Sequence, residues 1–265
     1  MPTFKLTLAY DGTDFVGWQR QAAGVSIQGL LEDACRELDG REVPVTGAGR
    51  TDAGVHALGQ VAGASIVRSM RAASLVSAIN ARLPDSVRVV DASEVAGTFQ
   101  PRFHARSKTY RYRIWNRDVL SPFERRYAWH LPAPELDVEA MAAAASLLEG
   151  RHDFASMQSV GSDVGSTERT VFSSRIIEAG DPSPEAWSTA WQPWKDWPPG
   201  FIVYEVSGDG FLRHMVRTIV GTLAEVGRGR HPVAWVRDVL DAKNRSRAGP
   251  TAPAEGLFLV RVDYP

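Results

Sequence analysis

The chain has 265 residues, a net charge of −1 and an apolar share of 44%, which fits a globular protein with one large domain or two smaller ones. The single cysteine, Cys35, excludes an intrachain disulfide and a thiolate metal cluster. We expect no targeting signal, because Met1 to Tyr10 alternates instead of showing a basic start and an apolar run. We expect no membrane span, because Arg213, His214 and Arg217 interrupt the most apolar helical stretch. The expected location is the cytoplasm.

The near-neutral total charge conceals an uneven distribution. Val95 to Arg117 contains six cations and no acid, and Ala53 to Pro84 also lacks acids. Acidic residues concentrate in other segments, for example Glu32 to Glu42. Such segregation allows a neutral protein to present one basic face to phosphates, although charged runs are more often simply solvated. RNA binding is therefore an open hypothesis.

The first half of the chain alternates strands and helices. Phe4 to Tyr10 alternates apolar with more polar residues, which predicts a half-buried strand that ends at the Asp11-Gly12 turn. Helical spacing predicts a helix from Ile27 to Leu38, with Ser26 as its N-cap and Gly40 beyond its end. We also expect strands at Val43–Thr46, Val61–Val67 and Val87–Val90, and a helix at Leu75–Leu83 that Pro84 stops.

The second half continues this mixed pattern. Ser107 to Trp115 alternates, with Tyr110 on one face and Arg111 on the other. We expect helices at Val138–Leu148, at Phe211–Val226 and after Pro232, and strands at Val171–Ile177, Phe201–Val206 and Leu257–Tyr264. This order predicts an α+β architecture of two halves, residues 1–104 and 105–265, with a surface excursion at about 181–200.

The glycine-rich segment Gly47 to Gly54 follows a predicted strand and has three interpretations. As a tight loop, its glycines supply positive φ and Asp52 caps a turn. As a dinucleotide-binding loop it fails, because Asp52 stands at the third glycine position and the acid expected about 20 residues later is missing. The third interpretation comes from a resemblance to a known family.

Gly49-Arg-Thr-Asp-Ala-Gly-Val-His-Ala57 resembles the signature of the TruA family of tRNA pseudouridine synthases. Six further blocks are similar to that family and occur in the order expected for it: Tyr10–Arg20, Ser26–Gln28, Asn80–Pro84, Phe103–Arg113, Phe211–Gly221 and Ala254–Leu259. The resemblance implies the pseudouridine synthase fold, two α+β halves with mixed and antiparallel sheets that form a central cleft. It also implies that neither a cofactor nor a metal is required.

The same resemblance assigns roles to individual residues. The reaction breaks the N-glycosidic bond of a uridine, rotates the uracil and rejoins it through C5, which requires a carboxylate near C1′. Asp52 matches the family's catalytic aspartate, and its role as nucleophile, C2′ base or electrostatic stabiliser stays open. Tyr110 is expected to stack on the uracil with its hydroxyl placed for the C5 proton. The supporting residues are Arg50, Arg217 and Leu257, the last as a wall of the uracil site.

The implied partner is tRNA, with uridines 38, 39 and 40 of the anticodon stem-loop as targets and a homodimer as the binding form. Because a stacked base has to be flipped out, we expect cations to grip the backbone. The residues expected at phosphates are Arg20, Arg68, Arg106, Lys108, Arg111, Arg213, Lys243 and Arg247.

Three other functions are alternatives to this one. A zinc deaminase needs paired cysteine ligands, and the chain has one cysteine. A nucleosidase-like hydrolase needs a second converging carboxyl group, and the flank after Asp52 offers no nearby acid. A non-catalytic tRNA-binding module is a third alternative, because the basic strands would serve RNA binding equally well. Asp52 beside Arg50 discriminates between the two, since a protein that only binds tRNA has no need of that carboxylate.

Overall fold

The computed structural model describes residues 1–159, 165–178 and 200–265, which fold into two compact units. The first unit comprises Met1–Tyr110 and Leu257–Pro265, and the second comprises Arg111–Gly256. Most of the expected excursion at 181–200 lies outside the described residues. The mixed strands and helices of both units confirm the predicted α+β class.

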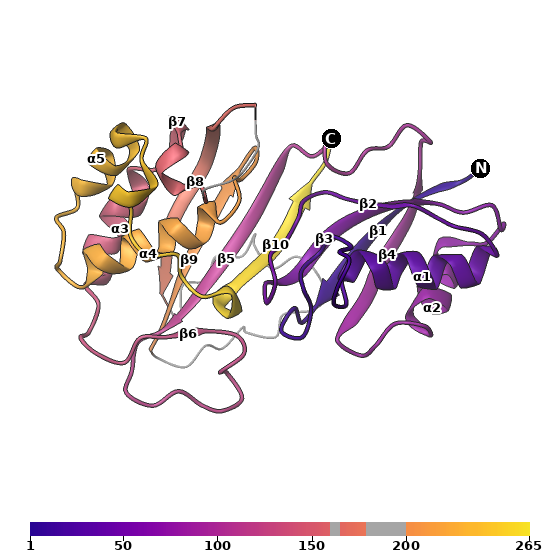
Figure 1. The fold of residues 1–265 in the computed structure, drawn as a ribbon, viewed down its shortest axis with the longest axis horizontal. Coiled ribbons are helices and arrows are strands. Elements are labelled where there is room, and N and C mark those ends of the chain that lie inside the picture. Colours follow the sequence, from indigo (N-terminus) through magenta and orange to yellow (C-terminus); the bar gives the residue numbers. More distant parts are fainter. Residues whose placement is uncertain (160–164, 179–199) are drawn as a thin grey trace. The chain divides into compact units, whose positions relative to one another are not determined.

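The first unit is built on a sheet in the order β4-β1-β3-β10-β5, with β2 beside β3. Its elements are β1 (Thr3–Tyr10), α1 (Ile27–Asp39), β2 (Val45–Gly47), β3 (His56–Ser65), α2 (Ala72–Asn80), β4 (Val87–Val95), β10 (Leu257–Asp263) and the start of β5 (Ser107–Trp115). Strand β1 runs antiparallel to β3 and β4, whereas β10 runs parallel to β3. Helices α1 and α2 contact each other, and α2 packs on β4 (Figure 1).

The apolar alternation of β1 is confirmed, since Phe4, Leu6 and Leu8 are buried in the core of this unit. The predicted caps of α1 are also confirmed. The Ser26 hydroxyl accepts a hydrogen bond from the Gly29 amide, and Gly40 adopts a left-handed φ of 70°.

The second unit has a sheet in the order β5-β9-β8-β7, with β6 beside β5. Its elements after β5 are β6 (Trp129–His130), α3 (Val138–Ser146), β7 (Gly150–Asp153), β8 (Glu168–Glu178), β9 (Phe201–Gly208), α4 (Met215–Gly227) and α5 (Trp235–Ala242). Short 3₁₀ turns lie at Ala155–Met157, Arg245–Arg247 and Ala254–Gly256. Helix α3 packs against both α4 and β8.

Three boundaries differ from the sequence-based expectation. Helix α4 begins at Met215 rather than Phe211, because His214 adopts a left-handed φ of 62° that interrupts a right-handed helix. Strand β3 begins at His56 rather than Val61, since its first residues pair with the distant β10. That pairing also brings the C-terminal strand into the first unit, so the compact units end at different residues from the expected halves.

Among the described residues, no helix combines the length and the apolar character that crossing a membrane demands.

Gly221 allows α4 to approach the segment after the 3₁₀ turn Arg245–Arg247 closely, which generates a stability prediction. A Cβ at Gly221 would lie 1.7 Å from the Pro250 carbonyl oxygen, so backbone would have to move. We expect Gly221→Ala to lower the free energy of unfolding by about 1–3 kcal/mol, measured from urea unfolding. Gly165→Ala is the matched control, because a Cβ there meets nothing within 4 Å. Equal stability of Gly221→Ala and the control would contradict the close approach.

Candidate active site

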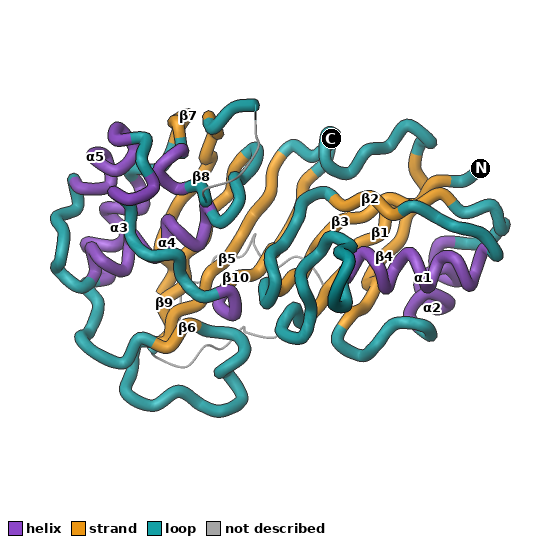
Figure 2. The backbone as a smooth tube through the Cα atoms, viewed as in Figure 1, coloured by secondary structure: helices purple, strands orange, loops and turns teal. Residues whose placement is uncertain are grey.

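The loop from Ala48 to Val55 connects β2 to β3 and carries Asp52 (Figure 2). On the β3 side it is fixed by two hydrogen bonds. The Ala48 amide donates to the Val61 carbonyl at 2.8 Å, and the Gln60 Nε2 donates to the Gly49 carbonyl at 2.9 Å. Gln60 is fully buried, so its amide group holds the loop in a region that water does not reach.

On the β1 side the loop is held at Thr51, the residue before Asp52. The Tyr10 hydroxyl lies 2.9 Å from the Thr51 Oγ1, and the Trp18 amide donates to the Thr51 carbonyl at 3.0 Å. Gly17, with a φ of 107°, allows this approach, because a Cβ there would lie 2.6 Å from the Thr51 carbonyl oxygen. Tyr10 and the Gly17–Trp18 segment, both distant in sequence, therefore fix the backbone beside Asp52 together with the following strand β3.

Asp52 is half-buried, and its carbonyl accepts a hydrogen bond from the Val55 amide at 3.2 Å in a tight turn. Gly54 completes the turn with a φ of 78°, in the left-handed region that glycine favours. The tight-loop interpretation is therefore confirmed at Gly54, whereas it is wrong for Gly47 and Gly49, whose φ angles are not in the left-handed region. Arg50, two residues earlier, is exposed.

The Asp52 carboxylate lies close enough to Tyr110 to act on its phenol electrostatically. Tyr110 is 7% exposed, and burial raises the pKa of its hydroxyl well above the ordinary value of about 10. The nearby Tyr10 and the Asp52 carboxylate raise that pKa further, since negative charge opposes ionisation of the phenol. The two residues that the sequence singled out as catalytic carboxylate and stacking tyrosine thus belong to one cluster in the first unit.

Leu257 stands at the start of β10 and is buried. Its neighbour Phe258 is in register with His56, the residue that follows the loop, and the two rings stack at 4.6 Å between centroids. The His56 Nδ1 accepts a hydrogen bond from the Gly12 amide at 3.0 Å. His56 is therefore a packing residue, and Leu257 lies on the strand next to the end of the loop.

Arg217 belongs to the second unit, in the first turn of α4. Its Nε donates to the Ala252 carbonyl at 2.7 Å, and the Ala252 amide donates to the Arg217 carbonyl at 3.0 Å. The expected pairing of Arg217 with Asp52 or a phosphate stays a prediction.

The cations expected at phosphates differ in their surroundings. Exposed positions are occupied by Arg68, Arg106, Arg213 and Arg247. Arg20 is exposed and forms ion pairs with Glu32 and Asp33, both at 3.1 Å, and Lys243 pairs with Asp153 at 3.1 Å. Lys108 is half-buried beside the Asp52 loop, with its Nζ 3.4 Å from the place of a Cβ on Gly49.

Arg111 requires a correction. Its side chain is buried, and its Nε donates to the Glu205 Oε2 at 2.6 Å. The other Glu205 oxygen pairs with Arg175 at 2.7 Å, so one carboxylate holds two guanidinium groups across neighbouring strands. A phosphate would have to compete with this buried pair, and we remove Arg111 from the expected RNA contacts.

Sequence reasoning assigned no role to Tyr10, Trp18 or Gln60. Tyr10 and Trp18 fall within the first block that resembles the family, which was the only available signal, because their contacts to the loop are long-range. For metals, a search of the described residues finds no cluster of three or more His, Cys, Asp or Glu side chains that could bind one.

Comparisons with known proteins show the family of the chain. The family model for tRNA pseudouridine synthase matches residues 7–104 and 144–265. A tRNA pseudouridine synthase A of Myxococcus xanthus is 46% identical over 264 residues, which are 100% of this chain and 92% of the relative. One of Moorella thermoacetica is 44% identical, with 100% of both chains covered. The chain therefore belongs to the tRNA pseudouridine synthase family.

Among solved structures, a chain of a Cbf5-Nop10-Gar1 complex is 11% identical with a TM-score of 0.36. The match covers 97% of this chain and 48% of that chain.

The buried Tyr10 hydroxyl predicts how stability changes at high pH. Burial raises the pKa of Tyr10 to about 12, partly offset by its hydrogen bonds to Thr51 and Gln60. Because the unfolded value is about 10, the folded state retains the proton longer, and stability is lost as the pH rises from 10 to 12. Tyr10→Phe should make this loss shallower by up to about 1.4 kcal/mol per pH unit, measured by urea unfolding at each pH. An unchanged slope would contradict the buried, protonated state of Tyr10.

Proposed function

We propose that this protein converts uridine to pseudouridine in tRNA, with Asp52 as the catalytic carboxylate. The supporting observation is the Asp52 loop, held by buried hydrogen bonds at Gly49 and Thr51 and lying beside the Tyr110 phenol. A carboxylate on a fixed backbone can be aimed at one atom of a substrate, which catalysis requires and mere RNA binding does not.

The chemistry assigned to Asp52 takes place at the ribose C1′. When the N-glycosidic bond breaks, positive charge develops on the sugar, and a carboxylate can stabilise it, form an adduct at C1′ or take the C2′ proton. The half-buried position of Asp52 suits all three roles, because partial exclusion of water strengthens its field without preventing access. Arg50 is proposed to support the site by filling the space of the extruded base.

Tyr110 is proposed to stack on the uracil and to handle the C5 proton. Since burial and the Asp52 charge raise its pKa, the phenol stays protonated at neutral pH. A neutral hydroxyl accepts a proton only while it passes its own proton on, so Tyr110 acts as a relay rather than as a preformed phenolate base. Leu257 is proposed as an apolar wall of the uracil site.

We further propose that the first unit carries the catalytic loop and that the second unit completes the site with Arg217. Arg68, Arg106, Arg213 and Arg247 are exposed and can reach the phosphates of a folded RNA. The target is proposed to be uridines 38, 39 and 40 of the anticodon stem-loop, and the working form a cytoplasmic homodimer.

Asp52→Asn tests the assignment most directly. The substitution keeps the size of the side chain and removes its charge, so we expect isomerisation to fall by at least about 10³-fold while tRNA binding persists. Activity is measured by mapping pseudouridine in tRNA treated with the purified protein, and binding by titration. Asp85→Asn is the matched control, since the Asp85 carboxylate is fully exposed. Turnover by Asp52→Asn would refute the catalytic role, and absence of pseudouridine with the unaltered protein would favour a binding module.

Tyr110→Phe separates stacking from proton transfer. The ring remains, so RNA should bind, whereas the loss of the hydroxyl should slow isomerisation by about 10²- to 10⁴-fold. The rate of a single turnover at saturating tRNA is the appropriate measurement. Full activity would mean that the hydroxyl has no chemical task.

A further inference from the structure

A second concave site lies in the first unit, formed by the start of β1, the segment from Val95 to Arg106 and the residues after β10. We call it the Phe103 pocket. Four rings line it, those of Phe99, Phe103, His104 and Tyr264, and its volume is about 500 Å³. This volume falls in the usual range for small-ligand pockets, about 300–1,000 Å³.

The rings are held in place, and one of them faces solvent. Phe99 lies 5.3 Å from Tyr264 and 6.0 Å from His104 between centroids. The Tyr264 hydroxyl donates to the Pro101 carbonyl at 2.8 Å, which anchors its ring. Phe103 remains 74% exposed, which is unusual for a phenylalanine beside other aromatic side chains. A flat apolar ring is thus offered to solvent on a fixed platform.

Cations surround these rings. The Lys5 Nζ lies 5.7 Å from the centre of the Tyr264 ring, and the Arg102 guanidinium lies 5.6 Å from that of Phe103. Arg106 also lines the pocket and is exposed. The acid next to Tyr264 is Asp263, which pairs with Arg261 at 2.8 Å and accepts a hydrogen bond from Ser107 at 2.6 Å.

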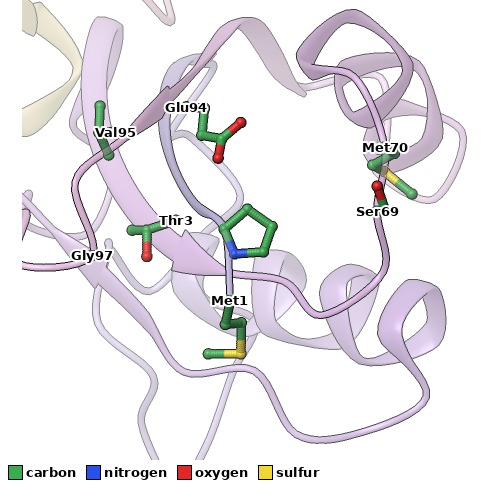
Figure 3. Close-up of a pocket in the computed structure, with 8 residues that line it drawn as sticks. Met1, Thr3, Ser69, Met70, Glu94, Val95 and Gly97 are labelled. Carbon is green, nitrogen blue, oxygen red and sulfur yellow. The ribbon is translucent and has the colours of Figure 1, made fainter.

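An adjacent hollow of about 480 Å³ provides a contrast (Figure 3). Val95 borders both sites. The adjacent hollow, however, is lined by Met1, Thr3, Met70 and the Glu94 carboxylate, without an aromatic ring. The Glu94 carboxylate would repel the phosphates of RNA, and the adjacent hollow has no aromatic ring on which a base could stack. The combination of rings and cations is therefore a property of the Phe103 pocket and not of that surface in general.

We propose that the Phe103 pocket binds one unstacked base of the RNA substrate, with Lys5, Arg102 and Arg106 contacting the flanking phosphates. Aromatic rings that stack on bases, combined with cations along the backbone, are the features by which proteins hold single-stranded nucleotides. The inference rests on the proposed function in that RNA is the substrate. The site is separate from the Asp52 loop, because Lys5 and Tyr10 stand five residues apart along β1, about 17 Å.

Phe103→Ala tests this inference with little effect on folding, since the side chain is mostly exposed. We expect the Kd for a tRNA transcript to rise about 5- to 100-fold, the range given by loss of one stacked base. Phe123→Ala, which removes a phenylalanine that is 85% exposed in the second unit, should leave the Kd unchanged. Lys5→Gln should reduce the slope of log K against log salt by about one.

An unchanged Kd for Phe103→Ala would overturn the proposal. So would a shift of the oligomeric state in light scattering, because the rings would then form an interface between two copies of the chain. The outcome is independent of catalysis: if the unaltered protein makes no pseudouridine but Phe103→Ala still weakens RNA binding, the proposed function fails and the base-binding site stands. If the unaltered protein forms pseudouridine and the Kd of Phe103→Ala equals that of the unaltered protein, the proposed function stands and the base-binding site fails.

Discussion

The hydrogen bond between the Tyr10 hydroxyl and the Thr51 Oγ1 joins the sheet to the loop on which the proposed chemistry depends. Tyr10 is the last residue of a strand whose inward side chains form the core, and Thr51 is the residue before Asp52. A single buried hydrogen bond contributes only about 0.5–1.5 kcal/mol, but leaving its partner unsatisfied costs more. The Gln60 amide reaches the same loop at Gly49, so any displacement of Asp52 would break buried polar contacts on two sides.

This arrangement explains why glycines follow β1 and why buried polar side chains occupy β3, on the two sides of the loop. Close approach of backbone from Gly12 and Gly17 brings the β1 turn against the loop, with a Cβ at Gly12 only 2.0 Å from the Val55 carbonyl oxygen. Each approach brings peptide groups into a dry region, where they have to be paired. His56 and Gln60 supply partners there, and both are buried. The loop is thus rigid because its hydrogen bonds are made by the surrounding core.

Local patterns in the sequence predicted the strands, the caps of α1 and the α+β class, because these depend on periodicity and on neighbouring residues. They could not predict the pairing of the C-terminal strand β10 with β3, which is distant in sequence, or the left-handed His214 that delays α4. Arg111 was misassigned for the same reason. Its alternation in β5 is correct, but its partner Glu205 comes from a distant strand. The proximity of Asp52 to Tyr110 followed from the family resemblance and not from spacing.

The charge of the chain limits how it can hold RNA. Of the cations expected at phosphates, Arg20 and Lys243 are already paired to acids, so neutralising a phosphate with either one requires that ion pair to open. Counterion release at these two positions is therefore reduced, and a stacked base adds affinity that does not depend on charge. A second anchor at a distance from the catalytic loop also fixes the orientation of the RNA, as a single flipped base cannot. The aromatic rings at Phe99 and Phe103 can therefore add binding affinity that does not depend on the charge of the protein.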